Sequence, residues 1–265
     1  MSACRREKKH LFIVCPNQSG SSMIYRYLNK CRYASIIDGE GQLSWGSSGP
    51  VNMVGPYKDY YFSEYAEQFA DTNNYNWVNI KTSWQNGWNK NVAQNKKQGV
   101  SVFVEKSPPN VFRIHLLKEQ FVNPYFILSI RCPYAMCEGM RRHVGYDLSL
   151  GAKHWGKCAR QQIKNIKSAI DNNNGVFYRY EDFCTNPEPA RLAIVGMIPE
   201  LDDLSFSGQV AVHSIEDITG QTGKNVFNFN EKQYANLTSD DLCAINKVLD
   251  DYQEEMEYFK YERRH

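Results

Sequence analysis

The sequence predicts an α/β fold with a mainly parallel central sheet flanked by helices. Apolar, strand-like runs recur at residues 11 to 15, 101 to 104, 125 to 130 and 176 to 180, and the segments between them carry helical spacing. Alternation of this kind implies right-handed crossovers and places ligands at the carboxyl edge of the strands. With 265 residues, 42% of them hydrophobic, the chain can bury one full core, so we expect residues 1–265 to form a single domain.

The first strand-like run, Leu11 to Cys15, leads into a turn of small residues and then into a helix-like segment from Ile24. Strand, tight loop and helix in this order make a phosphate cradle, because the loop N–H groups and the helix N-terminus both present positive charge to an anion. The G-x-x-x-x-G-K-[ST] spacing of nucleotide hydrolases is absent, which disfavours ATP hydrolysis. We therefore expect a different anionic ligand at this loop.

Two long segments, residues 38–60 and 71–99, are rich in Gly, Ser, Asn, Tyr and Trp and show little periodicity. Long loops inside a compact domain tend to be functional or disordered, so we interpret both as candidate cover for an acceptor site, with disorder as the alternative for residues 89–99. Their aromatic side chains suit stacking on a flat ring or a sugar face, although aromatic residues are also ordinary core material. These residues are Trp45, Tyr57, Tyr60, Tyr61, Trp77, Trp84 and Trp88.

Two amphipathic helices are predicted in the second half of the chain. One runs from His154 to Ile170, and the other from Thr238 through Tyr258. Thr238 and the polar residues after it are a plausible N-terminal cap for the second helix.

Charge and composition exclude several classes of function. A net charge of +2 gives no large basic field, so we expect no nucleic-acid partner. No apolar run approaches the ~20 residues of a membrane helix, and residues 1–10 are too polar for a secretory signal. The eight cysteines lack C-x-x-C pairs, so we expect free thiols and no bound metal. A glycan on the sequon Asn17-Gln18-Ser19 would block the phosphate loop, so we expect a cytoplasmic protein.

Four segments in chain order carry a family resemblance. Pro16 to Ser22, Pro-x-x-Ser-Gly-Ser-Ser, resembles the 5'-phosphosulfate loop of sulfotransferases, which commonly reads Pro-Arg-Ser-Gly-Thr-Thr. Glu105-Lys106-Ser107-Pro108, the apolar strand ending at Arg131, and Tyr180-Glu181-Asp182 are similar to later segments of the same family. The four matches cover most of the chain, so it resembles an enzyme of the P-loop-like sulfotransferase architecture that uses 3'-phosphoadenosine 5'-phosphosulfate (PAPS) and releases adenosine 3',5'-bisphosphate, without a metal.

The resemblance implies a set of cofactor-binding residues. The 5'-phosphate would be held by Gln18, Ser19, Gly20, Ser21, Ser22 and Met23, unless Ser21 or Ser22 is only a helix cap. Arg131 would hold the 3'-phosphate, because a charge at the end of an apolar strand needs an anionic partner. Gly139 stands where the family has a serine for that phosphate. We therefore expect either weaker cofactor binding or binding that relies on backbone or on Arg141 and Arg142, which are more often solvent-facing.

Two further cofactor contacts follow from the same resemblance. Tyr180 would contact the adenine, with packing at a strand end as the alternative. Lys224, in the loop Gly220 to Lys224, would contact a phosphate, and a surface turn explains it equally well.

The resemblance also implies the chemistry. Glu105 would be the general base for the acceptor, unless it only forms an ion pair with Lys106. Lys106 would supply positive charge at the leaving group, and Gln18 falls where the family has a cationic residue. We therefore expect in-line sulfuryl transfer to a hydroxyl or amine of a small-molecule or glycan acceptor. The departures at Gln18 and Gly139 keep open a catalytically degenerate binding protein, and a small-molecule kinase is a weaker alternative because a loop lysine is missing.

Overall fold

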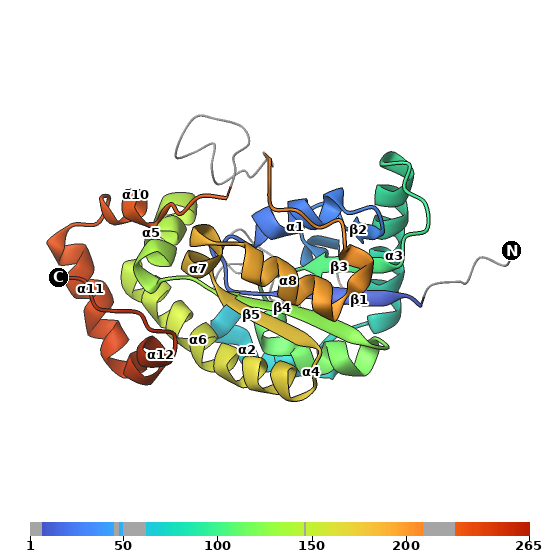
Figure 1. Cartoon of the computed structure of the whole chain (residues 1–265). Helices are drawn as coiled ribbons and strands as arrows, with labels where there is room; N and C mark the ends of the chain where they lie inside the picture. Colours follow the sequence, from blue (N-terminus) through green and yellow to red (C-terminus); the bar gives the residue numbers. More distant parts are fainter. Residues whose placement is uncertain (1–6, 45–47, 50–61, 146, 209–225) are drawn as a thin grey trace, which may run out of the picture.

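The structure of the protein, a computed structural model, describes residues 7–44, 48–49, 62–145, 147–208 and 226–265. Within these residues five strands form one sheet with the order β2-β3-β1-β4-β5, and all neighbouring pairs are parallel (Figure 1). The strands are β1 (Lys9–Val14), β2 (Ala34–Ile36), β3 (Val102–Lys106), β4 (Pro124–Ile130) and β5 (Gly175–Arg179). The predicted α/β class with a parallel central sheet is confirmed.

Helices cover both faces of this sheet (Figure 1). In the first half of the chain they are α1 (Ser21–Lys30), η1 (Gly41–Ser44), η4 (Phe62–Tyr65), α2 (Ala66–Ala70), η5 (Thr72–Asn74), α3 (Trp77–Gln94) and α4 (Asn110–Gln120). In the second half they are α5 (Pro133–Val144), α6 (Leu148–Asp171), α7 (Tyr180–Thr185), α8 (Glu188–Met197), η6 (Pro199–Leu201), α10 (Asn230–Tyr234), α11 (Ser239–Leu249), η7 (Asp250–Tyr252) and α12 (Gln253–Tyr258).

The strand period of two divides the core into two clusters. Along β1, Leu11 and Ile13 pack in one cluster with α1 and α8. Phe12 and Val14 point to the other face and pack in a cluster with α4, α5 and α6. Because successive side chains of a strand point to opposite faces, a continuous apolar run is required where both faces are covered.

The interpretation of residues 71–99 as a loop is wrong. Most of this segment is helix α3, which is 18 residues long, with Asn76 as its N-cap. Trp84 and Trp88 of α3 lie in the core and are fully buried, so they do not line an open mouth. Of the other segment, residues 38–60, only 38–44 and 48–49 are described, so Trp45 and Tyr57 lie outside the described residues, as do Tyr60 and Tyr61.

Two predicted helices are confirmed in outline. Helix α6 extends the predicted 154–170 segment at its N-terminal end, where the Asp147 side chain caps it. The predicted 238–258 helix is split into α11, η7 and α12. Thr238 is its N-cap, as predicted, and forms a capping box with Asp241.

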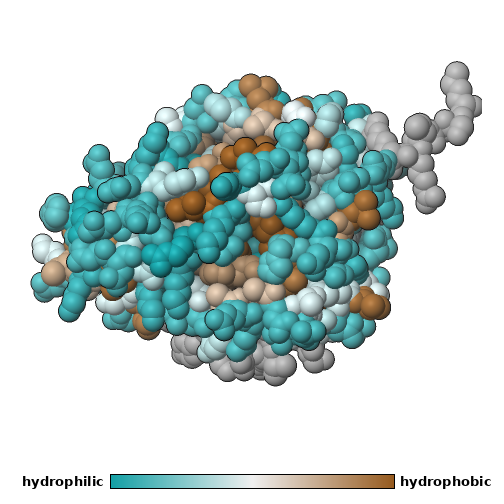
Figure 2. Space-filling view, turned by 90° about the horizontal axis from the view of Figure 1, so that it is seen from below, coloured by the Kyte–Doolittle hydropathy of each residue, from teal (hydrophilic) through white to brown (hydrophobic). Residues whose placement is uncertain are grey.

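The carboxyl ends of all five parallel strands meet at one edge of the sheet, where the loops that carry the predicted site residues also begin. The face seen from below is mostly hydrophilic, with apolar residues gathered toward its middle (Figure 2). Among the described helices, none combines the length and the apolarity that a membrane crossing needs.

Candidate active site at the carboxyl edge of the sheet

The loop between β1 and α1 turns tightly at two residues with positive φ, Gln18 at 57° and Gly20 at 78°. Gly20 is the N-cap of α1, so no side chain from the cap position covers the first-turn N–H groups. The alternative that Ser21 or Ser22 caps the helix is therefore wrong, since both lie inside it. A loop followed directly by an uncapped helix N-terminus presents N–H groups to an anion.

Tyr180, the first residue of α7, covers this loop. A Cβ added at Gly20 would lie 2.7 Å from the Tyr180 ring, so only glycine fits beneath it. The Tyr180 hydroxyl donates to the carbonyl of Phe227 at 3.1 Å. Burial raises the pKa of this phenol well above its ordinary value.

Arg131 follows the end of β4 and lies beside the loop, with only 6% of the residue exposed. Its Nη1 donates to the Gln18 carbonyl at 2.9 Å, and its Nε donates to Asn230 Oδ1 at 2.8 Å. Its Nη2 donates to Gln233 Oε1. The guanidinium also lies over the Tyr180 ring, 4.2 Å from its centroid. All of these acceptors are uncharged, so a buried cation stands next to the loop between β1 and α1.

Gly139 on α5 lies next to this cation. A Cβ built at Gly139 would lie 3.1 Å from both Gln18 Oε1 and Gln233 Nε2. The space that a serine side chain would take is therefore bordered by two amide side chains. Arg141 and Arg142, further along α5, pair with Asp241 and Glu138, respectively.

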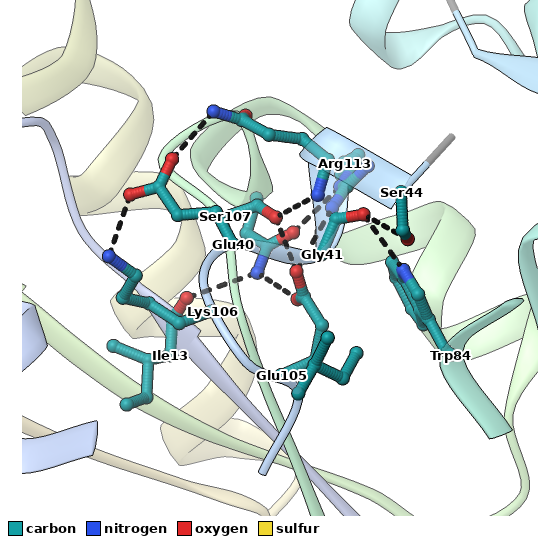
Figure 3. A network of polar contacts seen from close by, with 12 residues as sticks. Ile13, Glu40, Gly41, Ser44, Trp84, Glu105, Lys106, Ser107 and Arg113 are labelled. Carbon is teal, nitrogen blue, oxygen red and sulfur yellow. Dashed lines mark hydrogen bonds and ion pairs between the residues drawn. The ribbon is translucent and has the colours of Figure 1, made fainter. Parts of the chain in front are cut away.

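On the other side of the loop, Lys106 at the end of β3 bridges two groups. Its Nζ donates to Ser22 Oγ at 3.2 Å and to Glu40 Oε1 at 2.6 Å. Gln42 Nε2 donates to the second oxygen of Glu40 at 2.7 Å. The Glu40 side chain is 27% exposed, whereas that of Lys106 is 7% exposed. A buried cation and a partly exposed carboxylate thus lie together beside the helix that follows the loop (Figure 3).

Glu105 points away from Lys106 into the protein and has no exposed surface. One of its oxygens accepts from Ser107 Oγ and lies 3.8 Å from Arg113 Nη2, and the other accepts from Asn110 Nδ2 at 2.8 Å. Figure 3 shows these groups converging on the carboxylate. Burial raises the pKa of Glu105, although Arg113 opposes that shift.

This geometry does not fit the expectation that Glu105 is the general base, because an acceptor cannot reach it without rearrangement. The alternative of a Glu105–Lys106 ion pair is also wrong, since Lys106 pairs with Glu40. Glu105 instead joins β3 to α4, because it accepts a hydrogen bond from Asn110. Asn110 also donates to the carbonyl of Ile13 and so joins α4 to β1.

The structure thus brings most of the predicted residues to one edge of the sheet. The loop residues, Arg131, Gly139 and Tyr180 lie together, and Lys106 lies on the other side of Ser22. Lys224 lies outside the described residues. In the described part of the chain, no cluster of three or more potential metal ligands is present.

Three residues of this edge were missed by the sequence analysis: Glu40, Asn230 and Gln233. Glu40 follows β2, which has only three residues and is too short to show a strand pattern in the sequence. Its place after an apolar run next to the small residues Asp38 and Gly39 was an available signal. Asn230 and Gln233 lie on the five-residue helix α10, for which the local sequence offers no distinctive pattern.

The chain has the fold of sulfotransferases. It matches the sulfotransferase domain from the curacin biosynthetic pathway with a TM-score of 0.53 and 17% sequence identity, over 98% of this chain and 100% of that domain. It matches the sulfotransferase domain from the Synechococcus PCC 7002 olefin synthase with a TM-score of 0.51 and 15% identity, over 97% and 96% of the two chains. No family model and no curated protein sequence matches it. The likeness runs through nearly the whole chain, so it is a likeness of the fold and not of the phosphate loop alone.

Proposed function

We propose that this protein is a PAPS-dependent sulfotransferase. One observation carries the proposal: a buried arginine and a lysine–glutamate pair lie on opposite sides of one phosphate-type loop, and among the described residues no carboxylate pairs with that arginine. A donor with two phosphate groups and a transferable sulfuryl group needs a cation for the distal phosphate, N–H donors for the central one, and positive charge with a base at the reacting end.

The fit of the donor to these residues rests on their burial and donor chemistry. Ser19, Gly20, Ser21, Ser22 and Met23 would hold the 5'-phosphate through the loop and the start of α1. Arg131 would hold the 3'-phosphate, and Tyr180 would contact the adenine. The bound donor would supply the sulfuryl group, whose bond to the 5'-phosphate breaks as a bond to the acceptor oxygen or nitrogen forms.

Lys106 and Glu40 would carry the catalytic roles. Lys106 Nζ would stabilise negative charge at the leaving phosphate oxygen, the position at which Gln18 brings no charge. The carboxylate of Glu40 would take the acceptor proton, because it is partly exposed and lies 2.6 Å from Lys106 Nζ. Glu105 would help to position Glu40 through a chain of hydrogen bonds. Ser107 Oγ donates to Glu105 and accepts from the backbone N–H of Gln42, whose side chain donates to Glu40.

Ligand selectivity tests the cofactor. In calorimetric titrations we expect the wild type to bind adenosine 3',5'-bisphosphate more tightly than AMP or ATP. The Arg131→Ala variant should lose roughly tenfold or more of the bisphosphate affinity, the loss expected for a charge-assisted hydrogen bond, with little change for AMP. Arg141→Ala is the matched control, because its guanidinium pairs with Asp241. Equal affinities of the wild type for the bisphosphate and AMP would refute the assignment.

A matched pair of carboxylate variants tests the base. With a labelled sulfuryl donor and a screened acceptor, Glu40→Gln should slow transfer by about 10²–10⁴-fold while bisphosphate affinity is kept. Glu105→Gln should keep turnover within about tenfold for the folded enzyme, because its carboxylate does not face the acceptor. The reverse order of these two effects would return the role to Glu105.

A catalytically degenerate binding protein is the second candidate. Gln18 in place of a cationic residue and the amides that already bond Arg131 favour it. Bisphosphate binding without transfer to any acceptor in the screen, in the wild type and in Gln18→Lys alike, would support this candidate.

A further inference from the structure

We propose that Asn230 and Gln233 are positioning residues that separate Arg131 from two nearby carboxylates and thereby keep it selective for a 3'-phosphate. The inference rests on the proposed function, because it concerns the arginine that we assign to the donor. It adds two residues of α10, distant in sequence from the phosphate loop, to the determinants of donor selectivity.

Arg131 is a buried cation whose hydrogen bonds within the described part of the chain go to uncharged oxygens. They are Asn230 Oδ1, Gln233 Oε1 and the carbonyl of Gln18. Among the residues that the structure describes, no carboxylate lies within ion-pair distance of this guanidinium. None of the described groups that directly contact the guanidinium therefore neutralises its positive charge.

Two carboxylates stand one side chain further away. Asn230 Nδ2 donates to Glu181 Oε1 at 2.8 Å, and Gln233 Nε2 donates to Glu138 Oε2 at 2.8 Å. Each amide thus accepts from the cation with its oxygen and donates to a carboxylate with its nitrogen. An amide side chain can do both at once, whereas a carboxylate has no donor and an ammonium no acceptor.

This arrangement leaves part of the arginine for a ligand. A guanidinium has five N–H groups, and three of those of Arg131 are hydrogen-bonded, to Asn230, Gln233 and Gln18. Within the described part of the chain, one N–H on each terminal nitrogen has no acceptor. A phosphate can accept hydrogen bonds from such groups.

Gly139 is consistent with the same role. A side chain at this position would crowd Gln233 Nε2 and Gln18 Oε1 at 3.1 Å. Glycine therefore gives Gln233 room to keep its oxygen on Arg131 and its nitrogen on both Glu138 and the carbonyl of Ala135, which lies 2.9 Å away.

The test gives Asn230 or Gln233 a negative charge and measures the selectivity for adenosine 3',5'-bisphosphate over AMP. Gln233→Glu and Asn230→Asp each place a carboxylate directly on Arg131, where it competes with a phosphate. In calorimetric titrations at neutral pH, we expect each variant to lower the affinity ratio of adenosine 3',5'-bisphosphate to AMP by roughly tenfold or more. AMP affinity should change by less than about threefold, because AMP carries no 3'-phosphate.

Two controls separate charge from packing. Asn236→Asp places the same new charge beside Glu138, whose Oε1 accepts from Asn236 at 3.0 Å, but does not touch Arg131, so the ratio should stay unchanged. Gln233→Leu removes the hydrogen bonds without adding a charge, so the protein should still prefer the bisphosphate. A structural role alone would lower both affinities together in all Gln233 variants.

The outcomes distinguish this inference from the proposed function. Equal affinity of the wild type for the two nucleotides would refute the proposed function and the inference with it. A clear preference in the wild type that survives in the acidic variants would overturn the inference and leave the proposed function standing. Circular dichroism establishes folding, and if one acidic variant does not fold, the other decides.

Discussion

At the scale of single residues, the clearest lesson comes from Glu105 and Lys106. They are neighbours in the sequence, which suggested an ion pair, but both lie on β3. Because successive side chains of a strand point to opposite faces, one enters the core beside Arg113 and the other reaches Ser22. Their charges therefore have different partners and different roles.

Burial of Glu105 should make stability depend on pH. Its folded-state pKa is raised above the ordinary value of 4.5, chiefly by burial, so the folded protein holds this proton more tightly than the unfolded chain. The contribution of this group to the free energy of unfolding is therefore greatest below pH 4.5 and decreases as the pH rises through the folded pKa. Urea denaturation from pH 4 upward should show this decrease in the wild type relative to Glu105→Gln. A parallel pH dependence in the two proteins would show that the carboxyl is not shifted.

Gly41 offers a packing test beside the same carboxylate. A Cβ at this position would clash with Glu105 Oε1, and Glu105 is held by hydrogen bonds that resist movement. We expect Gly41→Ala to lower the free energy of unfolding by about 1–3 kcal/mol, as overpacking does.

Gly196 provides the matched control for that substitution. It lies inside α8, and a Cβ there would meet nothing within 4 Å. Gly196→Ala should raise stability by up to about 1 kcal/mol, because alanine is the better helix former. Chemical denaturation measures both changes, and equal effects would argue against crowding at Gly41.

At the scale of secondary-structure elements, the sequence of α3 contains a helical pattern that the loop prediction did not use. The prediction of a loop at residues 71–99 rests on their Gly, Ser, Asn, Tyr and Trp content and their lack of evident periodicity. The buried residues of α3 nevertheless lie at Trp77, Ile80, Trp84, Trp88 and Asn91, which is the spacing of one helix face. The strands at 101–104 and 125–130 were found because they are apolar throughout, and β2 was missed because three residues show no period.

The start of α11 is an element boundary that the sequence did reveal. The Thr238 hydroxyl accepts from the N–H of Asp241 at 3.2 Å, and Asp241 Oδ2 accepts from the N–H of Thr238 at 2.9 Å. We expect Thr238→Ala to cost about 1 kcal/mol of unfolding free energy, measured by urea denaturation. Thr238→Ser retains a hydroxyl and should be close to wild type, so equal losses in both variants would mean that the cap is not the cause.

At the scale of the whole molecule, the parallel sheet explains why part of the site could be predicted. The carboxyl ends of parallel strands meet at one edge. The loop after β1, Lys106 at the end of β3, and Arg131 and Tyr180 after β4 and β5 therefore had to lie near one another. The contacts of Arg131 with Asn230 and Gln233 could not be predicted in this way. They depend on how the carboxyl-terminal helices dock against α5, and no local pattern records that docking.

Ligand binding should stabilise the whole chain if the site is used as proposed. Adenosine 3',5'-bisphosphate at about one hundred times its Kd should raise the free energy of unfolding by about 2.7 kcal/mol, which corresponds to about 5–10 °C in Tm. Thermal unfolding across a ligand series measures this shift. AMP at the same concentration should give a smaller shift, and Arg131→Ala should abolish the difference between the two ligands. A shift of equal size with both ligands in the wild type would contradict the prediction.

The position of α10 in the chain also sets an order of events during translation. The chain up to Arg179 contains the five described strands, the loop between β1 and α1, and Arg131. The amides that face the arginine come later in the sequence, at Asn230 and Gln233. A ribosome therefore completes the sheet before it makes these two groups. Until then Glu138 and Glu181 have no amide standing between them and the guanidinium. If these two amides set the selectivity as proposed, discrimination between nucleotides can begin only when α10 has emerged and docked.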